Sequence, residues 1–453
     1  MHPGFRQRRR WFPYGLGSTL LALALCLAAL PLAGCRRGGA ALPLTGNPDP
    51  SDVEITYWHS WTGDAEQTLL TLVSRYNKDN GLGIVVRAVH AGDTGEILSK
   101  VEAVSATSDL VPQVVDVGAA QRSRYLANDM LVDLEPYAGD PRWGLGDSST
   151  IIGDLIDLHG RSGPRGGPLL RFPVGADVVV MVYNRAWLER LGYDKPPSDW
   201  RALTNVSEAA SDPAQARYGF AVPLDALVLT AQVYSRGGSL LESRGDGFRL
   251  KTRALRTPLK LMRRLQSNGH ALVLADPSEQ QLAFAQGKVL LALSPSRHLA
   301  HYGRSVRSAA GGPFDWAVAA PPHSTSRPVL ALSVHGLGVL RGAPEVQLAG
   351  WHFIRWLTTP EPQALLSTAA DLLPVSIAAT KHLRDHFEAH PQQREAFLLL
   401  AGSELRPAPD FDAQPLLRER LESAYASVMN GAELDRTLRK LRKQASGMSG
   451  DER

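Results

Sequence analysis

The stretch VEITYWHSWTGDAEQTLLTLVSRYNKDNGLGIVVRAV, residues 53–89, indicates the fold class of this chain. Its two ends, residues 53–58 and 84–89, both have the pattern of β-strands. Between them the apolar side chains follow the i, i+3, i+4, i+7 spacing of one helical face, at Leu69, Leu72, Val73 and Tyr76. A strand, a helix and a second strand in this order predict a parallel strand pair with a crossover helix.

The alternation of strands and helices continues after this stretch. Ile97, Val101 and Val104 mark a second helix, and residues 114–117 form a third strand. The order β-α-β-α-β implies a mainly parallel sheet with helices on both faces. Because ligands of such sheets bind beyond the carboxyl ends of the strands, we expect a site near residues 59–61 and 116–121.

A second α/β block follows and then returns to the first. Strand patterns at residues 177–183, 289–293 and 316–319 alternate with helical patterns at 200–210, 255–265 and 277–286. A strand at 334–340 and a helix at 346–357 lead back to the first block, and the residues beyond Pro374 have an almost wholly helical pattern. Two α/β lobes joined by several crossings are suited to close around a ligand by hinge motion.

The N-terminus has the pattern of an export signal. Four arginines in the first ten residues precede an apolar run at residues 16–32, which is short for a membrane span. Leu32-Ala33-Gly34-Cys35 then resembles a bacterial lipobox, which implies cleavage before Cys35 and lipidation of that cysteine. A permanent membrane helix is the less favoured alternative. A twin-arginine signal at Arg9 and Arg10 is a weaker resemblance than a general basic n-region.

The excess of basic residues belongs to this signal. The chain has 49 Lys and Arg against 45 Asp and Glu among 453 residues, and no acidic residue precedes Cys35. The four arginines of the signal therefore account for the whole excess, and the charge of the chain does not indicate a nucleic-acid partner. After cleavage the chain keeps no cysteine that could pair with Cys35, because Cys26 leaves with the signal.

Six motifs in order carry a resemblance to a known family. They are TYWHSWTG (56–63), VVDVGAAQRSRYLANDMLVDLEPY (114–137), MVYNRAWLERLGYDKPPSDWRAL (181–203), FAQGKVLLALS (284–294), GVLRGAPEVQLAGWHFIRWLTTPEPQALLS (338–367) and LLPV (372–375). Together they resemble the extracellular solute-binding proteins of sugar ABC importers (family 1, maltose-binding-protein-like). The first motif is most similar to the glycerol-3-phosphate-binding branch.

The resemblance implies a two-lobed periplasmic-binding-protein fold of type II-like topology. Each lobe would be a mainly parallel sheet covered by helices, with a ligand cleft and a hinge between the lobes. The expected parts are a signal peptide (1–34), a lipidated Cys35 with a flexible tether (35–52), lobe I (53–175 and 332–370), lobe II with the C-terminal helices (176–331 and 371–443) and a disordered tail (444–453).

The family pattern also implies which residues contact the ligand. After the first and third strands they are His59, Ser60, Trp61, Asp64, Asp116 and Gly118. From the first crossing and the second lobe they are Asp177, Leu224, Asp225, Ser294 and Ser296. From the return crossing and the C-terminal region they are His335, Gly336 and Arg406.

Three departures from the phosphate-binding branch bear on the ligand. Leu224 and Leu227 stand where that branch has aromatic residues, and Leu372 replaces an aromatic residue of the last motif. Asp177 occupies the position of a small hydroxyl, and a carboxylate would repel a phosphate. We therefore expect a neutral or amino sugar, a polyol or a glycerol-derived compound rather than glycerol-3-phosphate itself.

The resemblance implies a substrate-binding component and not an enzyme. It would be held at the extracytoplasmic face of the bacterial cell membrane by its lipid and would work as a monomer with ABC permease subunits, without cofactor or metal. The histidines at 382, 386 and 390 have the spacing of a solvated helix face. Two alternatives stay open: a lipid-anchored glycoside hydrolase using Asp116 and Asp177, and a receptor that reports to a membrane sensor.

Overall fold

The computed structural model describes residues 44, 46–105, 111–118, 121–146, 152, 155–160, 167–244, 247–409 and 414–446. All of them belong to one compact unit, Ala41–Arg453. The expected signal peptide and Cys35 lie outside the described residues. Of the expected tail, residues 444–446 are described and form the end of the last helix.

The first part of the unit has the predicted β-α-β-α-β order. Its elements are β1 (Glu54–His59), α1 (Gly63–Asp79), β2 (Val85–His90), α2 (Thr94–Ser105) and β3 (Val114–Asp116), followed by the short helices α3 (Arg122–Ala127) and α4 (Glu135–Ala138). β1 pairs in parallel with both β2 and β3. The apolar face predicted for α1 is buried, which confirms the helical periodicity of the opening stretch.

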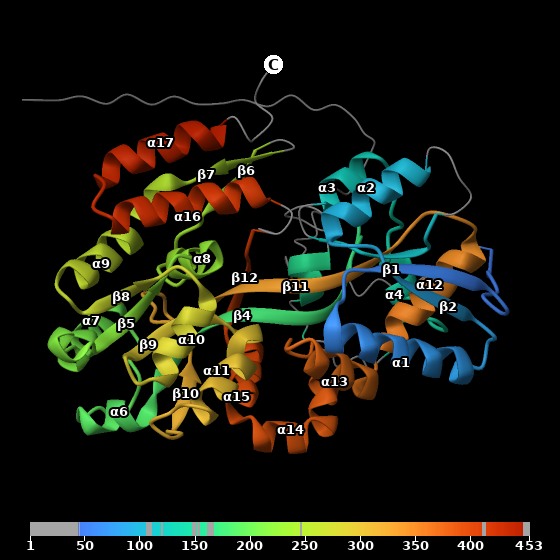
Figure 1. Cartoon of the computed structure of the whole chain (residues 1–453). Helices are drawn as coiled ribbons and strands as arrows, with labels where there is room; N and C mark the ends of the chain where they lie inside the picture. The colour runs from blue at the N-terminus through green and yellow to red at the C-terminus, as the bar shows by residue number, and fades with distance from the viewer. Residues whose placement is uncertain are drawn as a thin grey trace, which may run out of the picture. The chain divides into compact units, whose positions relative to one another are not determined.

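Two long strands connect the two ends of the sheet. They are β4 (Phe172–Asn184) and β11 (Val329–Val339), which pair antiparallel to one another and run side by side through the middle of Figure 1. The complete strand order is β2-β1-β3-β11-β4-β9-β5-β8, with β10 beside β4 and β12 beside β11. Both strands begin before the ranges predicted from the sequence.

The second part of the unit contains four further strands of the sheet. These are β5 (Tyr218–Pro223), β8 (Ala271–Leu274), β9 (Val289–Pro295) and β10 (Trp316–Ala319), with a separate hairpin of β6 (Leu241–Arg244) and β7 (Gly247–Leu250). The helices are α6 (Arg185–Arg190), α7 (Trp200–Ala210), α8 (Ala226–Tyr234), α9 (Arg256–Ser267), α10 (Pro277–Ala285) and α11 (Leu299–Arg307). β5 pairs in parallel with β8 and β9, so this end of the sheet is also partly parallel.

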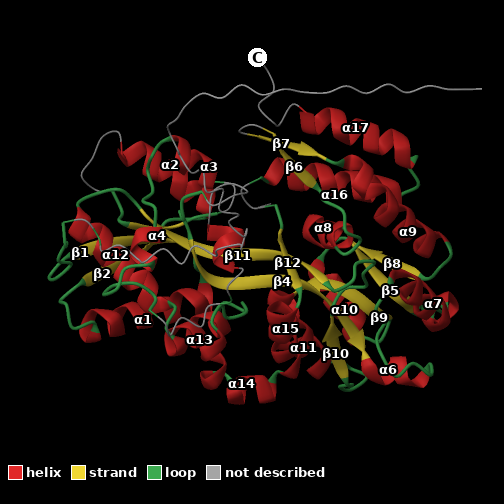
Figure 2. Ribbon diagram, turned by 180° about the vertical axis from the view of Figure 1, so that it is seen from behind, coloured by secondary structure: helices red, strands yellow, loops and turns green. Residues whose placement is uncertain are grey.

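The C-terminal part is mostly helical, with one strand. Its elements are α12 (Pro344–Leu357), α13 (Pro360–Ala369), α14 (Arg384–Ala389), α15 (Pro391–Gly402), β12 (Glu404–Pro407), α16 (Pro415–Met429) and α17 (Leu434–Ser446). β12 is an exception to the predicted helical run and pairs in parallel with β11. Figure 2 shows α16 and α17 with α9 and α8 beside the end of the sheet that holds β5 and β8.

The three histidines at 382, 386 and 390 do not lie on one helix as expected. His382 ends a 3₁₀ helix, His386 lies in α14, and His390 lies between α14 and α15. Pro391 directly after His390 begins the next helix, and a residue before proline is disfavoured in helical geometry.

The two ends of the sheet bury separate apolar cores. One core includes Tyr57, Leu69 and Trp351 from β1, α1 and α12. The other includes Phe220, Met262 and Tyr425 from β5, α9 and α16. Apolar burial of this kind stabilises by about 25 cal/mol per Å². Two cores joined by shared strands are the physical basis of a two-lobed unit.

The strand β4 is buried on both faces. Val178, Val180 and Val182 lie in a third core with α11 and α15. Their neighbours Val179 and Met181 lie in the core of the β5 end. Because alternate side chains of a strand point to opposite faces, helices must cover both sides of this part of the sheet. Among the helices of the described ranges, none is long and apolar enough to cross a membrane.

Candidate functional site

A cleft of about 770 Å³ lies where the connecting strands meet the carboxyl ends of β1, β2 and β3. From the first part of the chain it is lined by Ser60, Thr62, His90, Gly92, Asp93, Thr94, Glu96, Val117 and Gly118. From β4, β11 and the later segments it is lined by Arg171, Asp177, Arg297, Ser333, Val334, His335, Gly336, Leu372, Ala408 and Arg418. The position agrees with the rule that ligands bind beyond the carboxyl ends of parallel strands.

Asp116, the last residue of β3, is fully buried behind this cleft. Its Oδ1 accepts from the Tyr57 hydroxyl at 2.5 Å, and its Oδ2 accepts from the backbone N–H and the hydroxyl of Ser60 at 2.7 and 2.6 Å. The Nε2 atom of His335 lies 3.1 Å from Oδ2. Burial alone would raise the pKa of Asp116, but His335 and the donated hydrogen bonds outweigh it and lower the pKa.

Aromatic side chains next to Asp116 are linked by hydrogen bonds and ring contacts. Trp61 Nε1 donates to the Tyr57 hydroxyl at 3.1 Å, which in turn donates to Asp116. Burial, followed by the neighbouring Asp116, raises the pKa of Tyr57, so its hydroxyl keeps the proton that it donates. The Trp61 ring packs on the His335 ring with centroids 3.8 Å apart. His335 lines the cleft and Trp61 does not, so the imidazole is the ring that faces a ligand.

Asp177 is also buried, but it lines the cleft. It lies on β4 opposite Ser333 of β11. Its Oδ1 accepts from the Ser296 hydroxyl at 2.7 Å and from the Arg297 backbone N–H at 3.1 Å. The Arg297 guanidinium donates to Oδ2, and its side chain stays 36% exposed. The negative charge on this wall is therefore balanced within the protein.

A glycine on β11 makes room for a buried arginine. Arg171 is 1% exposed and donates from Nη1 to the carbonyl of Val117 at 3.0 Å. A Cβ on Gly336 would lie 2.5 Å from Cγ of Arg171. The pairing of β11 with β4 also shifts register between His335 and Gly336. A glycine inside a strand is a known sign of a bulge or a close approach, so the sequence did carry this signal.

The predicted site residues fall into two groups. Five of them line the cleft: Ser60, Gly118, Asp177, His335 and Gly336. The others do not line it: His59, Trp61, Asp64, Asp116, Leu224, Asp225, Ser294, Ser296 and Arg406.

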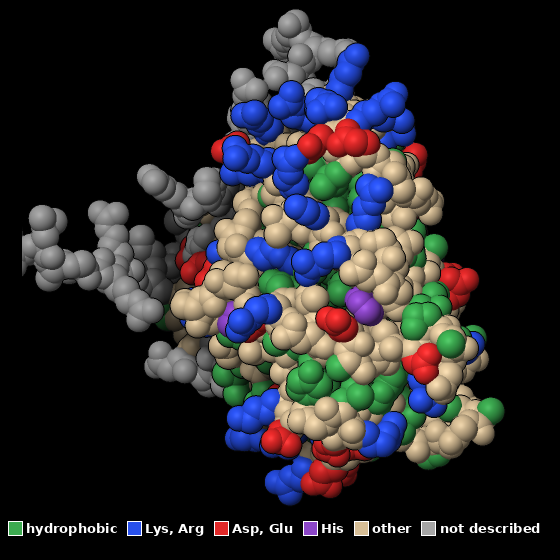
Figure 3. Space-filling model, turned by 90° about the vertical axis from the view of Figure 1, so that its left-hand side faces the viewer, with side chains coloured by type: hydrophobic (Ala, Val, Ile, Leu, Met, Phe, Trp, Pro, Cys, Tyr) green, Lys and Arg blue, Asp and Glu red, His purple; other side chains and the backbone are tan. Residues whose placement is uncertain are grey.

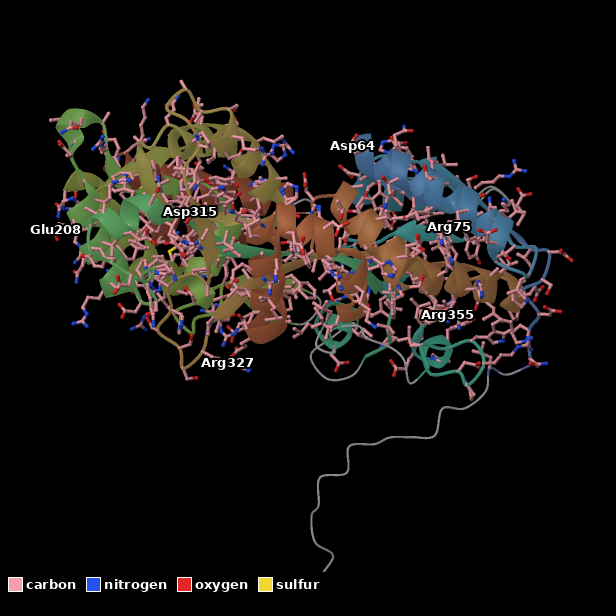
Figure 4. All side chains as sticks on the ribbon, turned by 90° about the horizontal axis from the view of Figure 1, so that it is seen from below. Asp64, Arg75, Glu208, Asp315, Arg327 and Arg355 are labelled. Atoms are coloured by element: carbon pink, nitrogen blue, oxygen red, sulfur yellow. The ribbon has the colours of Figure 1, made fainter. Side chains whose placement is uncertain are left out.

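The residues outside the cleft lining have identifiable positions. His59, Trp61 and Asp116 are buried behind the β1 and β3 wall, and Ser296 is buried behind Asp177. Asp64 is exposed near the start of α1, as Figure 4 shows.

The second-lobe candidates mostly serve local structure. The Asp225 carboxylate caps α8 by accepting from the backbone N–H of Val228 at 2.7 Å. Leu224 packs on the apolar core of the β5 end. Ser294 is buried, and its hydroxyl approaches the carbonyl of Pro295 at 3.3 Å. Arg406 donates to Glu404 and to the carbonyl of Gly238.

Several cleft residues were not predicted from the sequence. Among them are Asp93 and Glu96, which form a capping box at the start of α2. Asp93 accepts from the backbone N–H of Glu96 at 2.8 Å, and Glu96 accepts from the backbone N–H of Asp93 at 3.1 Å. The spacing Asp-x-x-Glu before an apolar helix is a recognisable signal for this motif. Arg297 carries no such local signal, because its partner Asp177 is 120 residues away.

A second cavity, of about 980 Å³, lies between α7 and α9, away from the predicted site residues. Six basic side chains line it: Arg201, Arg236, Arg253, Arg256, Lys260 and Arg264. None of its described lining residues is acidic. Figure 3 shows lysines and arginines gathered on the face that carries these helices. The cleft, in contrast, combines carboxylates, arginines and hydroxyls.

Comparison with solved structures shows that the fold is widespread. The chain is similar to the cyclic α-maltosyl-1,6-maltose binding protein of Arthrobacter globiformis, with a TM-score of 0.69, 18% identity, and coverage of 87% of this chain and 98% of that one. It is also similar to UgpB of Mycobacterium tuberculosis, solved with glycerophosphocholine, with a TM-score of 0.67, 20% identity, and coverage of 87% and 98%. These similarities confirm the two-lobed α/β fold predicted from the sequence.

Comparison with sequences identifies the family. YcjN of Escherichia coli strain K12, named as an ABC transporter periplasmic-binding protein, is 24% identical over 220 residues. That match spans 48% of this chain and about half, 47%, of YcjN. The profile described as "Bacterial extracellular solute-binding protein" matches residues 71–393, which include both ends of the sheet and most of the cleft. The chain therefore belongs to the family of bacterial extracellular solute-binding proteins.

Proposed function

We propose that this protein is the membrane-anchored, extracytoplasmic substrate-binding component of an ABC transporter that imports a carbohydrate or a glycerol-derived solute. The observation that carries the proposal is the cleft of about 770 Å³, which is lined from both ends of the sheet. This volume is within the range of about 300–1,000 Å³ that is usual for small-molecule sites.

The charges of the cleft favour a neutral, hydroxyl-rich ligand. Its carboxylates are Asp93, Glu96 and Asp177, and its arginines are Arg171, Arg297 and Arg418. Each of these arginines has an interaction partner within the protein. A phosphate would have to compete with those partners, whereas sugar hydroxyls can donate to carboxylates and accept from arginines at the same time.

The flat face of the His335 ring supplies a stacking surface for the proposed contact. Trp61 supports it from behind, and Leu372 lines the same cleft. Sugars present C–H groups as well as hydroxyls, so a ring face beside polar groups suits them. The named ligands of two fold neighbours, cyclic α-maltosyl-1,6-maltose and glycerophosphocholine, are a sugar and a glycerol derivative, which is consistent with this class.

We further propose that ligand binding favours closure of the cleft. The lobes would comprise 53–175 with 332–370, and 176–331 with 371–443. The connecting strands β4 and β11 would carry the hinge, and the register shift beside Gly336 is a natural position for bending. Contacts from both lobes would stabilise the closed state over the open one.

The location and partners follow from the same proposal. A lipid on Cys35 would hold the protein at the outer face of the cell membrane. Leu44 donates to Asp140 and Asp52 donates to the Leu82 carbonyl, so the part of the expected tether before Leu44 would give the binding unit its reach to a permease. The closed, loaded form would dock on the permease subunits and release its cargo there. A monomer is sufficient for this cycle.

A ligand panel tests the function directly. The chain from residue 36 onward keeps the whole compact unit and can be screened by thermal stabilisation against neutral sugars, amino sugars, polyols, glycerophosphodiesters and glycerol-3-phosphate. We expect stabilisation by a neutral or zwitterionic compound, and calorimetry should then show one site per chain. Product analysis of the same mixtures is the control for catalysis.

The outcomes separate the alternatives. Stabilisation without turnover supports the binding component, and loss of uptake of that compound after deletion of the gene supports the importer. Turnover of a glycoside would favour the hydrolase alternative instead. Preferred binding of glycerol-3-phosphate would contradict the argument from the paired arginines, and no stabilisation by any compound of the panel would contradict the proposal for this ligand class.

A further inference from the structure

Three metal-ligating side chains meet beside the cleft. His59 ends β1, His90 ends β2, and Glu66 lies in the first turn of α1. His59 and His90 are direct partners in the parallel pairing of the two strands. One ligand atom from each of the three side chains lies within 4.8 Å of the others.

His59 stands out in this cluster because of its burial. Its side chain is fully buried, and neither ring nitrogen has a hydrogen bond of normal geometry among the residues described, although the backbone of Trp61 interacts with the ring. A buried polar group without a partner costs about 1–3 kcal/mol, so such groups are rare in folded proteins.

His90 is already oriented as a ligand. Its Nδ1 lies 3.1 Å from the backbone carbonyl of Trp61. A carbonyl oxygen only accepts, so Nδ1 carries the proton and Nε2 has the free lone pair. Most metal-binding histidines are held in this way, with the second ring nitrogen donating to a carbonyl or carboxylate.

We propose that His59, Glu66 and His90 form a binding site for a divalent transition metal, with Zn²⁺ as the best fit. Two imidazoles and one carboxylate are a common zinc ligand set, with bonds of about 2.0–2.2 Å and a fourth position left open. The three ligand atoms already lie within 4.8 Å of one another, and rotation of the Glu66 and His90 side chains can adjust their positions around an ion. His90 also lines the cleft, so the ion would lie next to the solute site.

The proposal differs from the expectation of no metal. In the sequence His59 and His90 are far apart, and the parallel pairing of β1 with β2 brings them side by side. The inference goes beyond the proposed function, because a metal site can exist whatever solute the cleft takes.

Zinc titration tests the site. The chain from residue 36 onward is stripped with EDTA and titrated with ZnCl₂ by calorimetry, and with CoCl₂ by visible absorption. We expect one ion per chain and the intense visible bands of tetrahedral Co²⁺. The variants His90→Ala and Glu66→Gln should each weaken zinc binding by at least about tenfold. Both residues are less buried than His59, so these variants keep the test valid even if His59→Ala does not fold.

The second histidine pair is the matched control. His386 and His390 have ring centroids 4.7 Å apart, and His386 contacts Gln393. The variant His386→Ala removes one member of a histidine pair and should leave zinc affinity unchanged. The proposal is overturned if the parent chain binds no zinc at micromolar concentration, if His90→Ala and Glu66→Gln bind as tightly as the parent, or if affinity is lost in His386→Ala.

Discussion

Asp116 and Asp177 are two buried carboxylates of the same sheet, and their side chains have different surroundings. Both sit in strands and are at most 2% exposed. Asp116 accepts hydrogen bonds from Tyr57 and Ser60 on its own side of the cleft and does not line it. Asp177 accepts from Ser296 and Arg297 and does line the cleft.

We propose that this difference separates a structural carboxylate, Asp116, from a carboxylate that takes part in ligand recognition, Asp177. The donors around Asp116 are themselves buried or held by other contacts, so the charge can be moved only at a cost to the fold. The main partner of Asp177 is a side chain that is 36% exposed, so the pair can rearrange when a ligand enters. Asp116 reaches the cleft only through Ser60 and His335, so its carboxylate does not face a substrate directly as one of two paired catalytic carboxylates would.

The largest expected effect is on stability, from Asp116→Asn. The amide group cannot accept on both sides, so at least one of the donors from Tyr57 or Ser60 loses its acceptor. Each unsatisfied buried donor costs about 1–3 kcal/mol, and we expect a total loss of about 3 kcal/mol in the free energy of unfolding. Urea denaturation followed by tryptophan fluorescence measures it.

Asp129→Asn is the matched control for this change. Asp129 has a side-chain partner, Arg341, as Asp116 has Tyr57 and Ser60, but the Asp129 side chain is 76% exposed. Its left-handed backbone, with φ of 49°, suits asparagine as well as aspartate. Exposed substitutions usually change stability by less than about 0.5 kcal/mol. If the free energy of unfolding falls equally in Asp116→Asn and Asp129→Asn, the structural role assigned to Asp116 is wrong.

The next effect is on ligand affinity, from Asp177→Asn. A hydrogen bond to a charged group contributes about 1.5–3 kcal/mol, so the affinity for the compound found in the panel should fall by roughly 10- to 100-fold. Stability should change less than in Asp116→Asn, because water can replace the lost partner of Arg297. Calorimetry on both variants measures the affinity.

Lys251→Ala is the control for the affinity measurement. Lys251 lies 3.4 Å from Glu242 in an exposed salt bridge of the second part of the chain, and such pairs contribute about 0–1 kcal/mol. Its removal should leave ligand affinity unchanged. If Asp177→Asn binds the ligand as tightly as Lys251→Ala, then Asp177 does not take part in recognition. The proposed ligand site would then lack its main hydrogen-bond acceptor.

The sequence predicted the fold best where the periodicity was strong. The helix pattern of Leu69 to Tyr76 and the strand pattern of residues 53–58 correspond to α1 and β1 within a few residues. β5 and β8 were missed because they are short, mainly apolar runs, and a short apolar run without alternation does not distinguish a strand from a helix segment. β12 was missed because a charged sequence, Glu-Leu-Arg-Pro, pairs at the edge of β11.

The site was predictable in position but not in detail. Parallel strand order placed the cleft at the carboxyl ends of β1 and β3, where it lies. Alternation along an extended segment separates His59 from Ser60, yet which of the two faces the cleft depends on how α1 packs, and that is a tertiary property. The pairing of Asp177 with Arg297 and of His59 with His90 requires the fold itself.

The smallest expected effect is the pH dependence that Asp116 contributes. Its pKa is lowered in the folded state despite burial, because His335 and the hydrogen-bond donors favour the charged form. A lowered pKa stabilises the fold above the ordinary pKa of aspartate, 3.8, and this contribution is lost as the pH falls through the folded value. Each unit of lowering corresponds to about 1.4 kcal/mol.

The stability difference between the parent chain and Asp116→Asn should therefore shrink below pH 4. At low pH the parent carries a protonated Asp116, which resembles asparagine in charge and in having one donor group. Urea denaturation of both proteins at several pH values between 3 and 7 tests this, with Asp129→Asn as the reference for exposed carboxylates. If this stability difference stays constant over the pH range, the hydrogen bonds to Asp116 do not depend on its negative charge. The contrast between Asp116 and Asp177 would then rest only on their exposure to the cleft.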